Sequence, residues 1–189
     1  MIGGAMPQRY LAVAVLATLA PGLLTAAQGP RVAMHFEPQA PTKAFTTAAA
    51  DYDALWKAEG ERMLDAMERI TGVTFEERDI KAVIFEGPSS SGYGDRPMQL
   101  RASYPPDVKK ATLIHELLHR MLGRVKTTPE IDEHRKLFLV LYDIWVALYG
   151  KAFADENVVV ESKRKGLYDY ESAWKWALAM PAASPGYAW

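Results

Sequence analysis

The stretch ATLIHELLHRML, residues 111–122, places two histidines and a glutamate within a run of aliphatic side chains. On an α-helix, which turns about 100° per residue, His115 and His119 lie about 40° apart and Glu116 lies about 100° from His115. The aliphatic residues fill the opposite arc. The stretch therefore predicts a helix with a wide buried face and a single polar stripe, which carries both histidines and the glutamate.

A second helical pattern follows this helix after a short turn. Thr128 is expected to cap it, with Pro129 in its first turn, and the apolar spacing continues to Leu148 and stops at Gly150. Because a short connection makes neighbouring helices antiparallel, we expect a central antiparallel hairpin of these two helices.

The remaining chain predicts a small sheet and two further helices. Residues 32–36 read as an edge strand or an extended arm, and residues 79–87 and 97–105 as strands. Apolar residues recur at helical spacing from Thr46 to Thr71, and again over residues 166–180. The expected fold class is α+β: mostly helical, with a small β-sheet that precedes the central hairpin, in one domain over residues 28–189.

The first 27 residues are expected to be a secretory signal peptide. One basic residue, Arg9, precedes the apolar run LAVAVLATLA, and small residues at Thr25 and Ala27 favour cleavage between Ala27 and Gln28. The run is broken by Pro21 and is shorter than the roughly 18 residues that a membrane span needs. We therefore expect a secreted or periplasmic protein with no stable membrane insertion after cleavage.

The charge balance and the lack of cysteine limit the kinds of binding partner and of stabilising bond that the chain can have. Without Arg9 the mature chain has 21 basic and 23 acidic residues, a balance that argues against nucleic acid or a polybasic membrane contact. Cysteine is absent, so the exported chain has no disulfides and depends on an ordinary core, to which a bound metal could add stability.

The spacing His115-Glu116-x-x-His119 suits a metal site. Two imidazoles one helical turn apart can both direct a ring nitrogen at one ion, and the intervening glutamate can project toward its open side. A catalytic zinc site usually has three protein ligands. If the hairpin turns near residue 126, His119 faces residue 133 and His115 faces residue 137. His134, at the centre of the second helix's apolar face, is the favoured third ligand, with Glu133 and Glu130 as alternatives.

On these residues the chain resembles the zincin metallopeptidases, over about residues 105–149. The extended metzincin signature would need glycine at 122 and histidine at 125, where this chain has Leu122 and Val125, so that branch is not indicated. Gluzincins, with a ligand on the following helix, are more similar, but they use glutamate. With His134 as ligand the chain would be an atypical zincin.

The resemblance implies zinc-dependent hydrolysis of a peptide or protein substrate. One Zn²⁺ would lower the pKa of its water and polarise the scissile carbonyl, and Glu116 would act as general base. Tyr142, Tyr168 and Tyr170 are candidates for a further donor to the oxyanion. The segment PMQLRASYP, residues 97–105, is similar to the edge strand that holds an extended peptide in many zincins.

The chief alternative is an exported, non-catalytic metal-binding or structural protein with a closed zinc site. Such a site needs a fourth protein ligand, and Glu130 or Glu133 joining His134 could supply it. His35 is interpreted as an ordinary strand or surface residue. The loop SSSGYGDR, residues 89–96, could be either a flap over the site or a plain surface loop.

Overall fold

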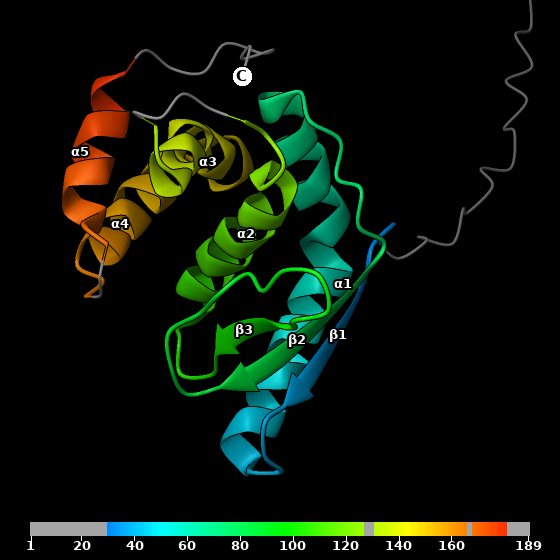
Figure 1. The fold of residues 1–189 in the computed structure, drawn as a ribbon. Helices are drawn as coiled ribbons and strands as arrows, with labels where there is room; N and C mark the ends of the chain where they lie inside the picture. Colours follow the sequence, from blue (N-terminus) through cyan, green and yellow to red (C-terminus); the bar gives the residue numbers. More distant parts are fainter. Residues whose placement is uncertain (1–29, 127–130, 166–167, 181–189) are drawn as a thin grey trace, which may run out of the picture.

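The computed structural model describes residues 30–126, 131–165 and 168–180, so the predicted signal peptide lies outside the described residues. The fold is α+β and mostly helical, as expected, with one three-stranded sheet (Figure 1). No helix within these ranges is long and apolar enough to cross a membrane. In chain order the elements are β1 (Ala33–Pro38), α1 (Lys43–Thr71), β2 (Asp79–Phe85), β3 (Met98–Arg101), α2 (Pro106–Leu122), α3 (Glu133–Tyr149), α4 (Lys151–Ser162) and α5 (Tyr170–Ala179).

The sheet has the order β1-β2-β3 and is parallel throughout, a direction that the sequence analysis had not assigned. Helix α1 connects β1 to β2. Residues 86–97, about a dozen, connect β2 to β3, which is close to the shortest crossover that parallel strands allow. Buried and exposed residues alternate along β2 and β3, so the strands bury one face.

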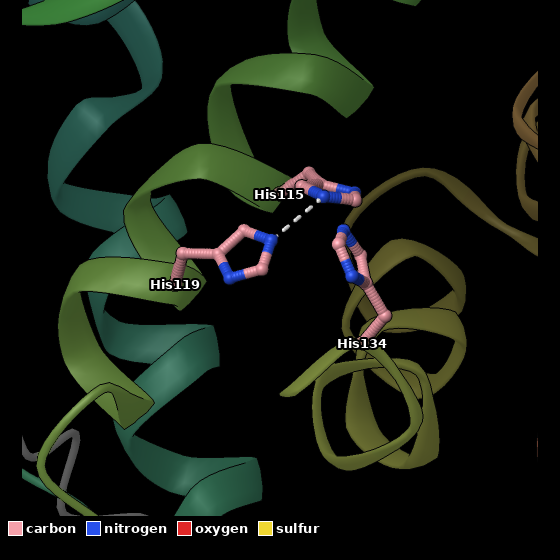
Figure 2. A group of neighbouring side chains, drawn as sticks. All are labelled: His115, His119 and His134. Carbon is pink, nitrogen blue, oxygen red and sulfur yellow. Dashed lines mark hydrogen bonds between the residues drawn. The ribbon is translucent and has the colours of Figure 1, made fainter. Parts of the chain in front are cut away.

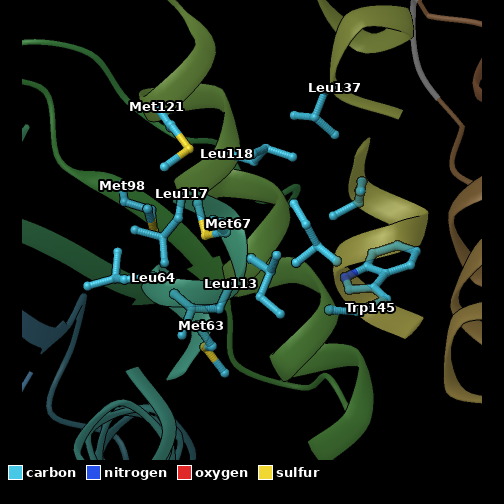
Figure 3. Close-up of a cluster of buried hydrophobic side chains, with 14 of the residues drawn as sticks. Met63, Leu64, Met67, Met98, Leu113, Leu117, Leu118, Met121, Leu137 and Trp145 are labelled. Carbon is cyan, nitrogen blue, oxygen red and sulfur yellow. The ribbon is translucent and has the colours of Figure 1, made fainter. Parts of the chain in front are cut away.

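Helices α1 and α2 contact the sheet, and α3 packs against both of them (Figure 1). The core between these elements is built from long, flexible and branched apolar side chains (Figure 3). Since the expected aliphatic face of α2 is buried in this core, the histidines of that helix are held on a rigid support. Core residues labelled in Figure 3 are Met63, Leu64, Met67, Met98, Leu113, Leu117, Leu118, Met121, Leu137 and Trp145.

The start of α3 differs from the expectation. A continuous helix from Thr128 is wrong, because residues 131 and 132 are not helical and α3 begins at Glu133. The Asp132 carboxylate accepts a hydrogen bond from the backbone N–H of Arg135 and so caps the helix. Glu130 lies outside the described residues.

Gly123 ends α2 as expected, but not through the left-handed conformation that usually selects glycine there. Its φ is −59°, which any residue adopts. A β-carbon at this position would lie 2.5 Å from the hydroxyl oxygen of Tyr93. The glycine is therefore explained by the close approach of this tyrosine to the end of α2.

Helix α4 was missed by the sequence analysis. It follows α3 directly, after Gly150, whose φ of 87° turns the chain. Helix α4 contacts α2, α3 and α5. Its contact with α2 helps to cover the polar stripe of that helix, in which His115, Glu116 and His119 are all buried.

Candidate metal centre

Three imidazoles converge between α2 and α3 (Figure 2). His115 and His119 come from adjacent turns of α2, and His134 faces them from the first turn of α3. One ring nitrogen from each lies within 4.8 Å of the other two. The Nε2 atoms of His115 and His119 are 3.1 Å apart. Such a spacing allows one ion to contact all three nitrogens, so the structure contains a histidine cluster that could bind a metal.

The contacts between the two helices lie close to the expected register. His119 lies against Glu133 and His134, while His115 lies against His134 and Phe138. The contact of His119 with residue 133 is the one expected, whereas His115, which was expected to face residue 137, contacts its neighbour Phe138 and also His134.

A buried carboxylate orients His115. Glu161 on α4 accepts a hydrogen bond from Nδ1 of His115 at 2.9 Å and another from the indole N–H of Trp174 at 3.3 Å. Burial alone would raise the pKa of Glu161, but His115 and Arg164 outweigh it and hold this pKa below its usual value. Burial lowers the pKa of His115 to about 4, so its ring is neutral near pH 7. With Nδ1 protonated toward Glu161, Nε2 is left free as a ligand atom.

A second carboxylate orients His119. Oε1 of Glu133 lies 3.1 Å from Nδ1 of His119, and the hydroxyl of Tyr93 donates to the same oxygen at 2.9 Å. The hydrogen bond with His119 lowers the pKa of Glu133 to about 2. Both histidines of the motif therefore turn Nδ1 toward a carboxylate and Nε2 toward the cluster.

The loop before β3 is tied to this centre. Tyr93 within it lies 2.7 Å from the carbonyl oxygen of His119, in addition to its contact with Glu133. In this structure the hydroxyl of Tyr93 thus attaches the loop to the centre. The sequence analysis, which allowed either a flap or a plain surface loop, did not predict this contact.

Two tyrosines lie against His134. The ring of Tyr168 stacks on the imidazole at a centroid distance of 4.2 Å, and the hydroxyl of Tyr170 lies 3.2 Å from Nε2. Burial lowers the pKa of His134 to about 4, so this ring too is neutral near pH 7. The metal-ligating form of His134 is therefore present at neutral pH.

Glu116 is the remaining residue of the motif. Its side chain is buried next to the histidines, with the whole residue only 3% exposed. Burial raises its pKa to about 7, although the nearby His119 and Arg164 lower it in part. A carboxyl group with a pKa near neutrality can both accept and release a proton there.

Among the sequence-predicted residues, the structure brings together His115, His119 and His134, and it places Glu133 against His119. Glu116 is buried on the same helix as the first two histidines. His35 lies elsewhere, on β1, where its exposed ring contacts Asp79. The three tyrosines considered as donors to the oxyanion differ in where their hydroxyls lie. The Tyr142 hydroxyl donates to Asp155, and the Tyr168 hydroxyl donates to Asp132. The Tyr170 hydroxyl instead reaches His134 of the cluster.

Glu161 and Tyr93 were missed. Ala154, Asn157 and Glu161 follow one another at helical spacing, but two of the three are polar, so only the structure shows that this stripe is buried. Tyr93 lies in a Gly- and Ser-rich loop and carried no signal either.

The edge of β3 that does not pair with β2 is covered by the preceding loop. Ser90 exchanges two backbone hydrogen bonds with Gln99, at 2.8 and 2.9 Å, and the Ser89 hydroxyl accepts from the backbone N–H of Arg101. An extended peptide could not pair with these groups unless the loop moved away. The expectation that residues 97–105 present a free edge for substrate is therefore not met in this structure.

Comparisons of this chain with protein-family models, with curated proteins and with solved structures find no match.

Proposed function

We propose that the chain is an exported zinc-dependent peptidase. The observation that carries the proposal is the histidine cluster itself: His115, His119 and His134 can share one ion. Glu116 is buried on the same helix, near enough to His119 for that histidine to affect its pKa. Three imidazoles suit Zn²⁺, which prefers nitrogen and sulfur ligands in tetrahedral sites. Export rests on residues 1–27 alone.

His134 is favoured over Glu133 as the third ligand. Glu133 occupies the far nitrogen of His119, which is the position of a supporting carboxylate rather than of a ligand. Within the described residues the candidate group contains the three histidines and no carboxylate. Three protein ligands leave a fourth position for water and substrate, as in catalytic zinc sites.

When bound, zinc would supply Lewis acidity and a water molecule of lowered pKa. The chain's own residues would do the rest. Glu116 would accept a proton from the attacking water and later deliver it to the leaving amine. Glu161 and Glu133 would hold the two imidazoles in orientation.

Tyr170 is the best-placed donor for the developing oxyanion. Its hydroxyl is the one among the three candidates that reaches the histidine cluster, at 3.2 Å from His134. Burial raises its pKa, so the hydroxyl stays protonated and can donate a hydrogen bond.

The experiment begins with metal analysis of the purified mature protein and of its Glu116→Gln variant. We expect about one zinc per chain in both proteins, because Glu116 is not a ligand. Incubation with a mixed peptide library should then show cleavage by the wild type that a chelator abolishes, and at least a hundredfold slower cleavage by the variant. A chain that binds no zinc, or a variant that cleaves at the wild-type rate, would contradict the proposal.

A closed, non-catalytic metal site is the second candidate, and one observation favours it. His115, Glu116 and His119 are all less than a tenth exposed, so access to the cluster is narrow. This alternative predicts zinc in both proteins, no hydrolysis by either, and loss of folded protein when the metal is removed.

A further inference from the structure

A basic cleft lies beside the histidine cluster. It has a volume of about 660 Å³ and is bounded by the loop before β3, the end of β3, the C-terminal end of α4 and the segment that enters α5. Six of its lining residues carry the argument, four cations and two tyrosines: Arg101, Lys163, Arg164, Lys165, Tyr168 and Tyr170.

The cleft is contiguous with the candidate metal centre. Tyr168 and Tyr170 line the cleft and also contact His134, one by ring stacking and the other through its hydroxyl. Arg164 joins the two regions on the other side, since its guanidinium lies 3.3 Å from Glu161 and 3.0 Å from the hydroxyl of Thr112 on α2. A ligand in the cleft would therefore lie next to the proposed catalytic groups.

The lining is positively charged, and no carboxylate is among the described residues that form it. Arg101 pairs with Glu86, and Arg164 pairs with Glu161. Lys163 and Lys165 are exposed and, in the part of the chain that the structure describes, neither makes an ion pair. These two lysines therefore leave the cleft with unbalanced positive charge.

Arg164 retains unused hydrogen-bonding capacity. Its Nε is buried and makes no hydrogen bond to the described residues, although the guanidinium carries five N–H donors. The Arg164 side chain as a whole is 18% exposed and lines the cleft, so a carboxylate ligand could accept a charge-assisted hydrogen bond from its guanidinium.

Because the edge of β3 is covered, a substrate peptide would need another binding surface near the histidine cluster. Ser90 pairs with Gln99, so a peptide cannot simply add to the sheet, whereas the cleft opens directly beside His134. Because Tyr168 and Tyr170 contact His134 and also line the cleft, residues of a bound peptide close to the scissile bond would lie in it.

We propose that this basic cleft binds acidic side chains, so that the substrates are peptides with Asp or Glu near the scissile bond. The substrate assignment rests on the proposed peptidase function. Binding of acidic peptides to the cleft does not, and the two can be measured separately.

Binding is tested with the zinc-loaded Glu116→Gln protein and fluorescently labelled peptides of equal length, one rich in Glu and its counterpart with Gln at the same positions. We expect the Glu peptide to bind about tenfold more tightly, with the difference shrinking at high salt because these charges are exposed. The double substitution Lys163→Glu and Lys165→Glu should remove the preference. A matched control, Lys43→Glu with Lys81→Glu, changes two exposed lysines outside the cleft and should preserve it.

Cleavage is tested by sequencing the products that wild-type protein forms from a mixed peptide library. Enrichment of Asp and Glu near the cleaved bonds, reduced by the cleft variant and kept by the control, is the expected result. Equal binding of the two peptides, or an acidic preference that survives reversal of both cleft lysines, would overturn the inference. If acidic peptides bind but nothing is cleaved, the peptidase function and the substrate assignment fail, and binding of acidic peptides to the basic cleft stands.

Discussion

Replacing Glu116 with glutamine should stabilise the metal-free protein at alkaline pH. Burial raises the pKa of Glu116 from 4.5 to about 7, so the folded state favours the neutral carboxyl group. Ionising a group with a raised pKa costs stability. The cost is absent below the unfolded pKa, grows between about pH 4.5 and 7, and is complete above pH 7. Glutamine has nearly the same shape and never ionises.

The magnitude follows from the shift. One pKa unit corresponds to about 1.4 kcal/mol, so holding the ionised carboxylate in place costs about 3 kcal/mol near pH 8. Near pH 5 the same shift costs less than about 1 kcal/mol, because in most folded molecules the Glu116 carboxyl group is still protonated. The expected gain of the variant in free energy of unfolding therefore rises with pH.

Urea denaturation of both proteins in chelator, at several pH values, measures this gain. Glu156→Gln is a suitable control, because Glu156 is exposed on α4 and its replacement should change stability by no more than about 0.5 kcal/mol. A variant that is no more stable than wild type near pH 8, or one whose gain is the same at pH 5 and pH 8, would refute the reasoning. The same substitution should also slow hydrolysis. The stability lost by burying an ionised Glu116 is therefore expected to be a cost that catalysis requires.

Three further predictions separate the roles within the centre. His134→Ala should abolish stoichiometric zinc binding, whereas Glu133→Gln should weaken zinc binding by about 10–100-fold, because it removes only a supporting carboxylate. Competition with a chromophoric chelator measures both affinities. A larger loss of affinity in Glu133→Gln than in His134→Ala would make Glu133 the ligand. Tyr170→Phe should lower kcat by about 10²–10³ at unchanged zinc content, and an unchanged kcat would exclude it as the oxyanion donor. Gly123→Ala should destabilise the fold by about 1–3 kcal/mol because the new methyl group meets Tyr93, and thermal unfolding should show no such loss in a Tyr93→Ala background.

Local chemistry accounts for what the sequence alone determined. Apolar spacing located α1, α2 and α5, because a helix must bury a stripe of side chains wherever it packs. The positions His115, Glu116 and His119 formed a recognisable pattern because helical geometry places residues one turn apart on one face, whatever surrounds them. An assumed short turn placed His134 opposite the other two histidines; the connection between α2 and α3 is longer than that, but His134 does contact both rings.

Tertiary packing decided the rest, because it depends on contacts between segments distant in sequence. The apolar pattern could not reveal that Asp132, with its capping carboxylate, would start α3 after the expected residue. The pattern also could not show that α4 would bring Glu161 onto His115, from 46 residues away, or that Tyr93 would reach across to Glu133. These contacts bury the polar stripe of α2, orient its histidines and raise the pKa of Glu116. The motif placed His115 and His119 on one face of α2, and the surrounding fold set their burial and protonation.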